Sequence, residues 1–214
     1  MKVTVIMASF LSPYPGSASN PEKKFIRAVN SFKSQSYKDT ELIIVSDGCE
    51  KTNALYDQHY HKDDNIFLIS IPKQPLYSGE MRNVALKQAS GDIVCYLDAD
   101  DVIGKKHIEM IVEQFTDEVD WVYYNDYLVQ SADFKTLHTR VVEPRYGSIG
   151  TSSISHRNFF SKKFDNLKKK PLWKTGYSHD WIYVLVISSM GMQFKKLNKT
   201  PQYLVCHYGN GGDF

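Results

Sequence analysis

Residues 93–101 read Ile-Val-Cys-Tyr-Leu-Asp-Ala-Asp-Asp, an apolar run that ends directly in three carboxylates. The apolar part, residues 93–97, has the near-continuous hydrophobic character of a strand buried on both faces of a parallel sheet. Ligands of open α/β sheets bind at the carboxyl ends of such strands. Asp98, Asp100 and Asp101 are therefore the first candidates for a functional site.

The residues of this acidic turn leave two interpretations open. Carboxylates so close together repel one another, and a bound cation would offset that repulsion. Hard oxygen ligands at a strand end suit Mg²⁺ or Mn²⁺, which commonly bridge a protein to substrate phosphates. A solvated turn that caps the following helix would carry the same residues, and short acidic motifs are common by chance.

Strand and helix signals alternate on both sides of the turn, and their order indicates the fold class. Apolar, β-rich runs predict strands at 3–9, 41–45, 66–71 and 93–97. Capping residues and helical spacing predict helices at about 21–32, 51–61, 78–89 and 108–115. This order predicts an α/β fold, a mostly parallel central sheet with helices on both faces.

The pattern changes after residue 120, where polar turns separate short strands. Strands are expected at 121–129, 136–142 and 149–156, then a helix at about 179–190 and strands near 193–197 and 202–207. These elements predict a mixed C-terminal extension of the sheet. The length of 214 residues fits a single domain, 1–214.

Composition excludes several classes of protein. Lys and Arg number 26 against 24 Asp and Glu, a balance that argues against nucleic acid as a partner. Cys49, Cys95 and Cys206 are far apart and odd in number, which argues against a zinc ribbon or a disulfide framework. The apolar runs fall short of the roughly 20 residues that span a bilayer, so a cytoplasmic protein with no transmembrane segment is expected.

Several short motifs, in order and in register, resemble glycosyltransferase family 2. They are 4–10 (TVIMASF), 31–37 (SFKSQSY), 41–48 (ELIIVSDG), 77–85 (YSGEMRNVA), 89–92 (ASGD) and 97–101 (LDADD). The resemblance implies the GT-A fold, a Rossmann-like αβα sandwich with a DxD metal motif. It also implies that residues 1–115 form a half that binds a nucleotide-sugar and residues 116–214 a half that binds the acceptor.

The resemblance implies roles for the matching positions in the first half. Ala8, Ser9 and Phe10 would line the base and ribose pocket, Asp47 and Arg82 would contact the nucleotide, Asp98 the ribose or the metal's water shell, and Asp100 the metal, Mn²⁺ or Mg²⁺. This chain has Ser46 where the family often has a second acidic residue. Structural roles remain open too, since Asp47 also suits a turn and Arg82 could pair with Glu80 or Asp92.

The second half supplies the other expected residues. Inverting members of the family place an aspartate as general base near the start of a late helix, which makes Asp180 the expected base; favourable charge at a helix N-terminus is the alternative. Many GT-A enzymes use a C-terminal histidine as an additional metal ligand, and His207 fits that place. The hydroxyls of residues 150–155 are expected on an acceptor-facing strand.

The resemblance therefore implies an inverting glycosyltransferase. It would move a sugar from a nucleotide-diphosphate sugar, UDP-sugar by family frequency, to a hydroxyl acceptor by metal-assisted single displacement. A catalytically silent module that binds nucleotide-sugars or glycans is one alternative. A sugar-phosphate nucleotidyltransferase is a weaker one, because residues 11–20 lack a glycine-rich loop with Arg and Lys.

Six lysines between residues 162 and 174 bear on the acceptor. They would attract an acidic glycan or a lipid-linked acceptor, with peripheral association at a membrane, or they form a solvated helix face. The acceptor is thus left as a glycan, a lipid-linked molecule or another hydroxyl compound.

Overall fold

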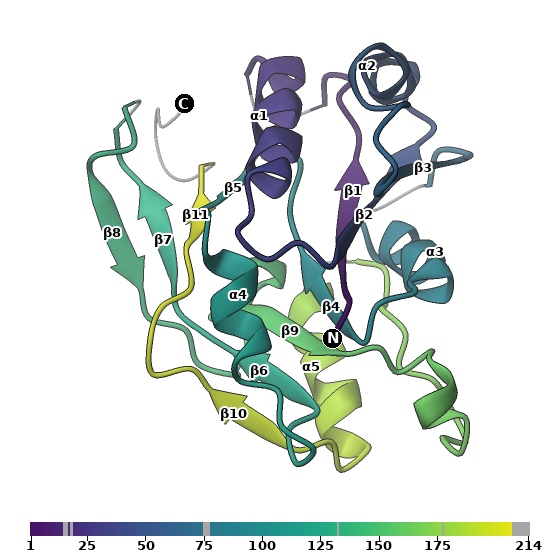
Figure 1. Cartoon of the computed structure of the whole chain (residues 1–214), viewed down its shortest axis with the longest axis vertical. Coiled ribbons are helices and arrows are strands. Elements are labelled where there is room, and N and C mark those ends of the chain that lie inside the picture. Colours follow the sequence, from purple (N-terminus) through teal and green to yellow (C-terminus); the bar gives the residue numbers. More distant parts are fainter. Residues whose placement is uncertain (15–16, 18, 75–77, 132, 177, 207–214) are drawn as a thin grey trace.

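The computed structural model describes residues 1–14, 17, 19–74, 78–131, 133–176 and 178–206, and within them the strands form two sheets. The larger sheet has the strand order β10-β6-β9-β4-β1-β2-β3, and the smaller has the order β5-β11-β7-β8. In Figure 1 the smaller sheet stands at the left of the molecule. None of the helices in the described ranges is long and apolar enough to cross a membrane.

The parallel part of the larger sheet comes from the first half of the chain, as expected. Its strands are β1 (Val3–Ser9), β2 (Thr40–Asp47), β3 (Ile66–Ile71) and β4 (Ile93–Tyr96). The neighbouring pairs β1–β2, β1–β4 and β2–β3 are all parallel. All eight residues of β2 are buried, which agrees with a strand covered on both faces.

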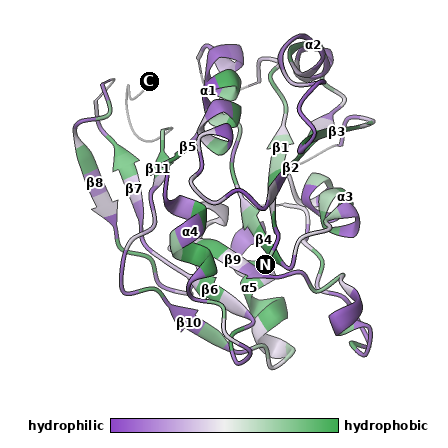
Figure 2. Cartoon of the chain, in the orientation of Figure 1, coloured by the Kyte–Doolittle hydropathy of each residue, from purple (hydrophilic) through white to green (hydrophobic). Residues whose placement is uncertain are grey.

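Helices cover both faces of this sheet and complete the sandwich (Figure 1). They are α1 (Pro21–Lys33), α2 (Glu50–His59), α3 (Gly79–Gln88), α4 (His107–Val112) and α5 (His179–Ser189). Alternate residues of β1 separate the two cores, because Val5 packs with α1, α2 and α4 whereas Ile6 packs with α3 and α5. Figure 2 shows apolar residues (green) along one side of α1, the side that this packing buries.

The second half adds the mixed extension. Three strands continue the larger sheet beyond β4: β6 (Trp121–Tyr123), β9 (Ile154–Arg157) and β10 (Phe194–Lys196). Strand β9 runs antiparallel to β4 and β6, and β10 is parallel to β6. The smaller sheet holds β5 (Val102–Ile103), β7 (Asp126–Val129), β8 (Leu137–Arg140) and β11 (Tyr203–Val205). The expected fold class, with a mostly parallel sheet and a mixed extension, is confirmed.

Three local expectations in this half are wrong. The strand expected at 121–129 is two strands in different sheets, because buried Tyr124 and the bond from Val142 N to Asn125 Oδ1 (3.0 Å) turn the chain between them. Residues 151–153 form a 3₁₀ turn, η1 (Thr151–Ser153), before β9 begins. The lysine-rich stretch holds only a short 3₁₀ turn, η2 (Lys162–Phe164), and no α-helix in its described residues.

Candidate active site

A cleft of about 850 Å³ opens at the carboxyl ends of β1, β2 and β4. Ten of the residues predicted from the sequence line it: Ala8, Ser9, Phe10, Asp47, Arg82, Asp98, Asp100, Asp101, Thr151 and Asp180. His207 lies outside the described residues. The strand order explains the convergence, because parallel strands bring their carboxyl ends to one edge of the sheet.

The end of β2 forms one wall of the cleft. Asp47 is almost fully buried, and its two carboxylate oxygens accept hydrogen bonds from Lys73 Nζ (2.5 Å) and Gln74 N (2.6 Å). The Lys73 ammonium also lies over the ring of Phe10, 4.4 Å from its centre. Asp47 therefore has the turn-holding role that the sequence left open, and it still lines the cleft.

Ser9 contributes less to the cleft than its position suggested. Its hydroxyl is buried and shares a hydrogen bond of 2.9 Å with Thr52 Oγ1 in the first turn of α2. Beside it, the thiol of Cys49 accepts a hydrogen bond from the backbone N–H of Leu11 at 3.2 Å. These bonds hold the start of the loop after β1 against α2.

The three aspartates of the acidic turn make different contacts. Asp101 is buried and accepts a hydrogen bond from Cys206 N at 2.8 Å, which ties the turn to the end of β11. The backbone N–H of Asp98 donates to the hydroxyl of Tyr203, also in β11, at 3.0 Å. Asp100 lines the cleft, and its backbone carbonyl is held by Arg27 Nη2 at 2.8 Å.

Mutual repulsion in this turn is visible in its electrostatics. Burial raises the pKa of the Asp98 carboxyl, and the negative charges of Asp100 and Asp180 add to that effect against the attraction of Arg82. Burial, with the charges of Asp100 and Asp98, raises the pKa of Asp101 still more. A cation in the cleft would relieve this repulsion, as expected for the acidic turn.

The turn fits a divalent cation that a substrate helps to hold. Within the described residues, no group of three or more His, Cys, Asp or Glu side chains could bind a metal alone. Mg²⁺ sites commonly use only one or two carboxylates and take further oxygens from water and substrate phosphates. Asp98 and Asp100 in an open cleft supply that donor set.

Arg82 lies between the acidic turn and the start of α5. Its Nη2 is 3.2 Å from Asp98 Oδ1, and its Nη1 is 3.9 Å from Asp180 Oδ1. The guanidinium is buried over the ring of Trp173, 4.7 Å from its centre. Among the described residues, Nη1 has no hydrogen-bond partner. Arg82 thus pairs with neither Glu80 nor Asp92 but with the two carboxylates of the cleft.

Asp180 sits in the first turn of α5 with several donors around it. Its Oδ1 accepts a hydrogen bond from Thr151 Oγ1 at 2.7 Å and lies 3.2 Å from His179 Nε2. Burial opposes ionisation of Asp180, but the hydrogen bond from His179, the charge of Arg82 and the bond from Thr151 lower its pKa overall. The carboxylate is therefore ionised at neutral pH and can accept a proton.

A family model described as "Glycosyl transferase family 2" matches residues 17–183. The chain belongs to glycosyltransferase family 2. Its relatives include the poly(ribitol-phosphate) β-N-acetylglucosaminyltransferase TarS of Staphylococcus aureus, 31% identical over 111 residues, which are 51% of this chain and 18% of TarS. The uncharacterized glycosyltransferase MJ1057 of Methanocaldococcus jannaschii is 30% identical over 132 residues, 58% of this chain and 42% of that protein.

Solved structures show that this family 2 chain has the GT-A type of fold. TarS 1–349 in complex with UDP-GlcNAc matches with a TM-score of 0.67 at 20% identity, over 99% of this chain and 60% of that one. A mannosyltransferase from Pyrobaculum calidifontis, in complex with GDP-Man and Mn²⁺, matches with a TM-score of 0.66 at 15% identity, over 98% and 58%. The chain therefore spans less than two thirds of these relatives.

Lys73 and Tyr14 are among the residues of the family 2 cleft that the sequence did not single out. Lys73 follows β3, and only the parallel register of β2 and β3, which pairs Asp47 with Ile71, shows that it reaches Asp47. Tyr14 lines the cleft from the loop after β1, and its pKa is raised by burial and by the charges of Asp100 and Asp98. An aromatic residue within a Ser- and Pro-rich loop was the available signal for Tyr14.

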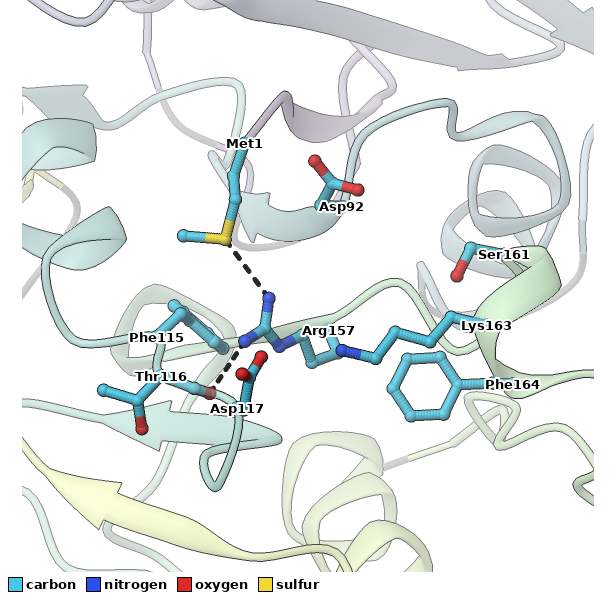
Figure 3. Close-up of a pocket in the computed structure, with 9 residues that line it drawn as sticks. All are labelled: Met1, Asp92, Phe115, Thr116, Asp117, Arg157, Ser161, Lys163 and Phe164. Carbon is cyan, nitrogen blue, oxygen red and sulfur yellow. Dashed lines mark hydrogen bonds between the residues drawn. The ribbon is translucent and has the colours of Figure 1, made fainter.

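A second hollow, of about 560 Å³, lies at the other edge of the sheet, where β1 and β4 begin. Figure 3 shows Arg157 in its middle, with Lys163 and Phe164 on one side and Phe115 on the other. The guanidinium donates to Thr116 O (2.8 Å) and lies over the Phe115 ring. Arg157 thus ties β9 to the loop after α4, a structural task remote from the acidic turn.

Proposed function

We propose that this family 2 chain is an inverting glycosyltransferase that uses a nucleotide-diphosphate sugar and a divalent metal. The observation that carries the proposal is Arg82, which lies between the donor-side carboxylate Asp98 and the candidate base Asp180 in one cleft. One ionised carboxylate beside the acceptor is what a single in-line displacement needs.

The donor side is assigned to the ends of β1, β2 and β4. Ala8, Phe10 and Asp47 would hold the base and ribose, with Lys73 as a further donor beside Asp47. UDP-sugar is the proposed donor class, supported by the UDP and UDP-GlcNAc complexes of TarS. GDP-sugar is the alternative, because the similar mannosyltransferase holds GDP-Man.

Asp100 and His207 are proposed to hold Mn²⁺ or Mg²⁺, with Asp98 at the ribose or at a water of the metal. When bound, the metal neutralises charge that develops on the diphosphate leaving group. The backbone N–H of Cys206, the last described residue, donates a hydrogen bond to Asp101 of the acidic turn. Cys206 directly precedes His207 in the sequence. The permanently charged guanidinium of Arg82 would also stabilise the negative charge of the same leaving group.

The acceptor side is assigned to the second half of the chain. Asp180 would take the proton from the acceptor hydroxyl as its oxygen attacks the anomeric carbon. Exposed lysines of the 162–174 stretch favour an anionic acceptor, although Lys163 lies at the remote hollow. TarS, a poly(ribitol-phosphate) β-N-acetylglucosaminyltransferase, is consistent with that class of acceptor. The acceptor would be a glycan, a lipid-linked molecule or another hydroxyl compound.

The testing experiment separates binding from catalysis at Asp180. Asp180→Asn keeps the shape of the side chain but cannot take a proton, so turnover should fall by roughly 10²–10⁴-fold. The Kd of the donor should change by less than about threefold. Hydrolysis and transfer would be followed with UDP-GlcNAc and with GDP-Man in Mn²⁺, with calorimetric titration of the same preparations.

Two further variants complete the experiment. Asp100→Ala should abolish the Mn²⁺-dependent part of UDP binding. Asp165→Asn is the matched control for Asp180→Asn, because the Asp165 side chain is exposed directly after η2. Undiminished turnover in Asp180→Asn would remove it from the mechanism. Parallel loss of binding and turnover would make it a donor-site residue, and donor binding without any turnover by the unmodified protein would favour a silent binding module.

A further inference from the structure

A buried ion pair lies outside the cleft, in the smaller sheet. Asp126 in β7 is fully buried and faces Arg140 of β8 across the antiparallel ladder. Arg140 Nε donates to Asp126 Oδ1 at 2.8 Å, and Arg140 Nη2 donates to Asp126 Oδ2. Two hydroxyls complete the cluster, because Ser152 Oγ (2.7 Å) and Ser153 Oγ (2.9 Å) both donate to Asp126 Oδ2.

Stability alone does not explain this cluster. Burying a charged pair costs desolvation that the attraction often only balances, and apolar residues of similar size usually serve a core as well. What the pair does achieve is to hold two consecutive serines on the same carboxylate. Those serines belong to the 3₁₀ turn η1, whose first residue is Thr151.

The geometry of the turn carries this restraint to Asp180. Ser152 and Ser153 both donate to Asp126, which fixes the second and third residues of the short turn. The first residue, Thr151, donates from its Oγ1 to Asp180 Oδ1 at 2.7 Å. The turn therefore links a buried carboxylate of the smaller sheet to the candidate base.

We propose that the Asp126–Arg140 pair positions the general base, by holding η1 so that Thr151 fixes Asp180. This inference rests on the proposed function. The contacts of Thr151, His179 and Arg82 all converge on Oδ1 of Asp180, and Oδ2 is the oxygen assigned to the acceptor hydroxyl. Thr151, Ser152, Ser153, Asp126 and Arg140 are positioning residues, since the reacting atoms belong to Asp180 and the substrates.

Asp180 has three charged or titratable neighbours, and these decide which residue should be replaced to test the proposal. Arg82 comes from α3, His179 from α5 itself, and Asp98 is the like charge across the cleft. Each of the first two has another partner, Asp98 for Arg82 and Gly176 O for His179 (3.2 Å). Thr151 is the uncharged donor, so its removal changes the orientation of the carboxylate and leaves the net charge of the site unchanged.

Two variants test the hydroxyl of Thr151. Thr151→Val removes it at nearly constant volume, and kcat should fall by about 10–100-fold, the value of a hydrogen bond to a charged group, with donor KM almost unchanged. The acid limb of the pH profile should move to higher pH, because the bond from Thr151 lowers the pKa of Asp180. Thr151→Ser keeps the hydroxyl and should restore most of both.

A double variant tests the transmission from the smaller sheet. Ser152→Ala/Ser153→Ala replaces no residue that lines the cleft, yet it should reproduce the lower kcat and the shifted pH profile. Ser155→Ala is the matched control, because its buried hydroxyl bonds to Tyr124 Oη (3.0 Å) and Cys95 and not to η1. That control should cost stability and leave kcat and the pH profile unchanged.

A readout without turnover keeps this test separate from the proposed function. The ¹³C carboxyl resonance of Asp180, assigned by its loss in Asp180→Asn, would be titrated in the free protein and in each variant. An Asp180 titration that the serine double variant leaves unmoved would overturn the inference. If instead the titration moves as expected but Asp180→Asn keeps full turnover, the positioning stands and the proposed role of Asp180 fails.

Discussion

The guanidinium of Arg82 makes contacts in this cleft that another cationic side chain could not make. A lysine could place a charge between Asp98 and Asp180, but it has no planar group to lie over Trp173 while two nitrogens face different carboxylates. The stacking holds the guanidinium in place before any substrate arrives. Its Nη1 is buried 3.9 Å from Asp180 Oδ1 and has no hydrogen-bond partner among the described residues.

Arg82→Lys should therefore weaken binding of UDP in Mn²⁺ by about 1–3 kcal/mol, although the charge is kept. Isothermal titration calorimetry measures the change directly. Arg157→Lys is the matched control, because Arg157 is also buried over an aromatic ring but lies at the remote hollow. Wild-type UDP affinity in Arg82→Lys would make the residue purely structural.

The sequence predicted most of the site at this scale because the site residues stand at strand and helix ends, where motifs have fixed spacing. Asp98, Asp100 and Asp180 lie in one cleft as the motifs implied, and their roles remain predictions. Lys73 was not predictable, because its contact with Asp47 depends on the register of β2 against β3. The partner of Arg82 was left open for the same reason, since it lies on another element.

Among the elements, the parallel strands were predictable and the later strands were not. Strands buried on both faces have continuous apolar runs, and β1 begins and ends where the pattern placed it. A run such as 121–129 carries no signal for the point where a chain leaves one sheet for another. Helix α1 begins at Pro21, as its pattern placed it, although the preceding residue, Asn20, is left-handed and makes no side-chain cap bond.

The turn after β2 is the element on which the base pocket most depends. Gly48 has φ +60°, and a Cβ there would lie 2.6 Å from Lys73 N. Gly48→Ala should therefore cost about 1–2 kcal/mol of backbone strain and displace the two donors of Asp47. Thermal unfolding and UDP titration should both show the loss.

Gly147→Ala is a control that separates the backbone strain from the displacement of the Asp47 donors. Gly147 has φ +74° and nothing within 4 Å of an added Cβ, so only the backbone strain remains. This variant should lose comparable stability and bind UDP as the wild type does. Equal UDP affinity in both variants would contradict a role for the turn in nucleotide binding.

On the scale of the whole molecule, two buried histidines couple folding to pH. Burial lowers the pKa of His107 to about 3, and neither of its ring nitrogens has a hydrogen-bond partner among the described residues. Burial also lowers the pKa of His156 to about 4, with its ring between Tyr96 Oη (2.7 Å) and Arg157 O (2.6 Å). Both side chains are therefore neutral in the folded protein, on opposite faces of the sheet.

Acid should therefore destabilise the fold well above the range in which carboxylates titrate. Below pH 6.5 the unfolded chain binds a proton at each histidine that the folded chain does not, so the free energy of unfolding falls as pH falls towards 4. His107→Phe removes one such site. The difference in free energy of unfolding between this variant and the wild type should shift in favour of the variant by about 2 kcal/mol between pH 7.5 and pH 5. Urea unfolding at both pH values measures this difference. A His107→Phe variant that tracks the wild type across this range would mean that His107 is protonated in the fold.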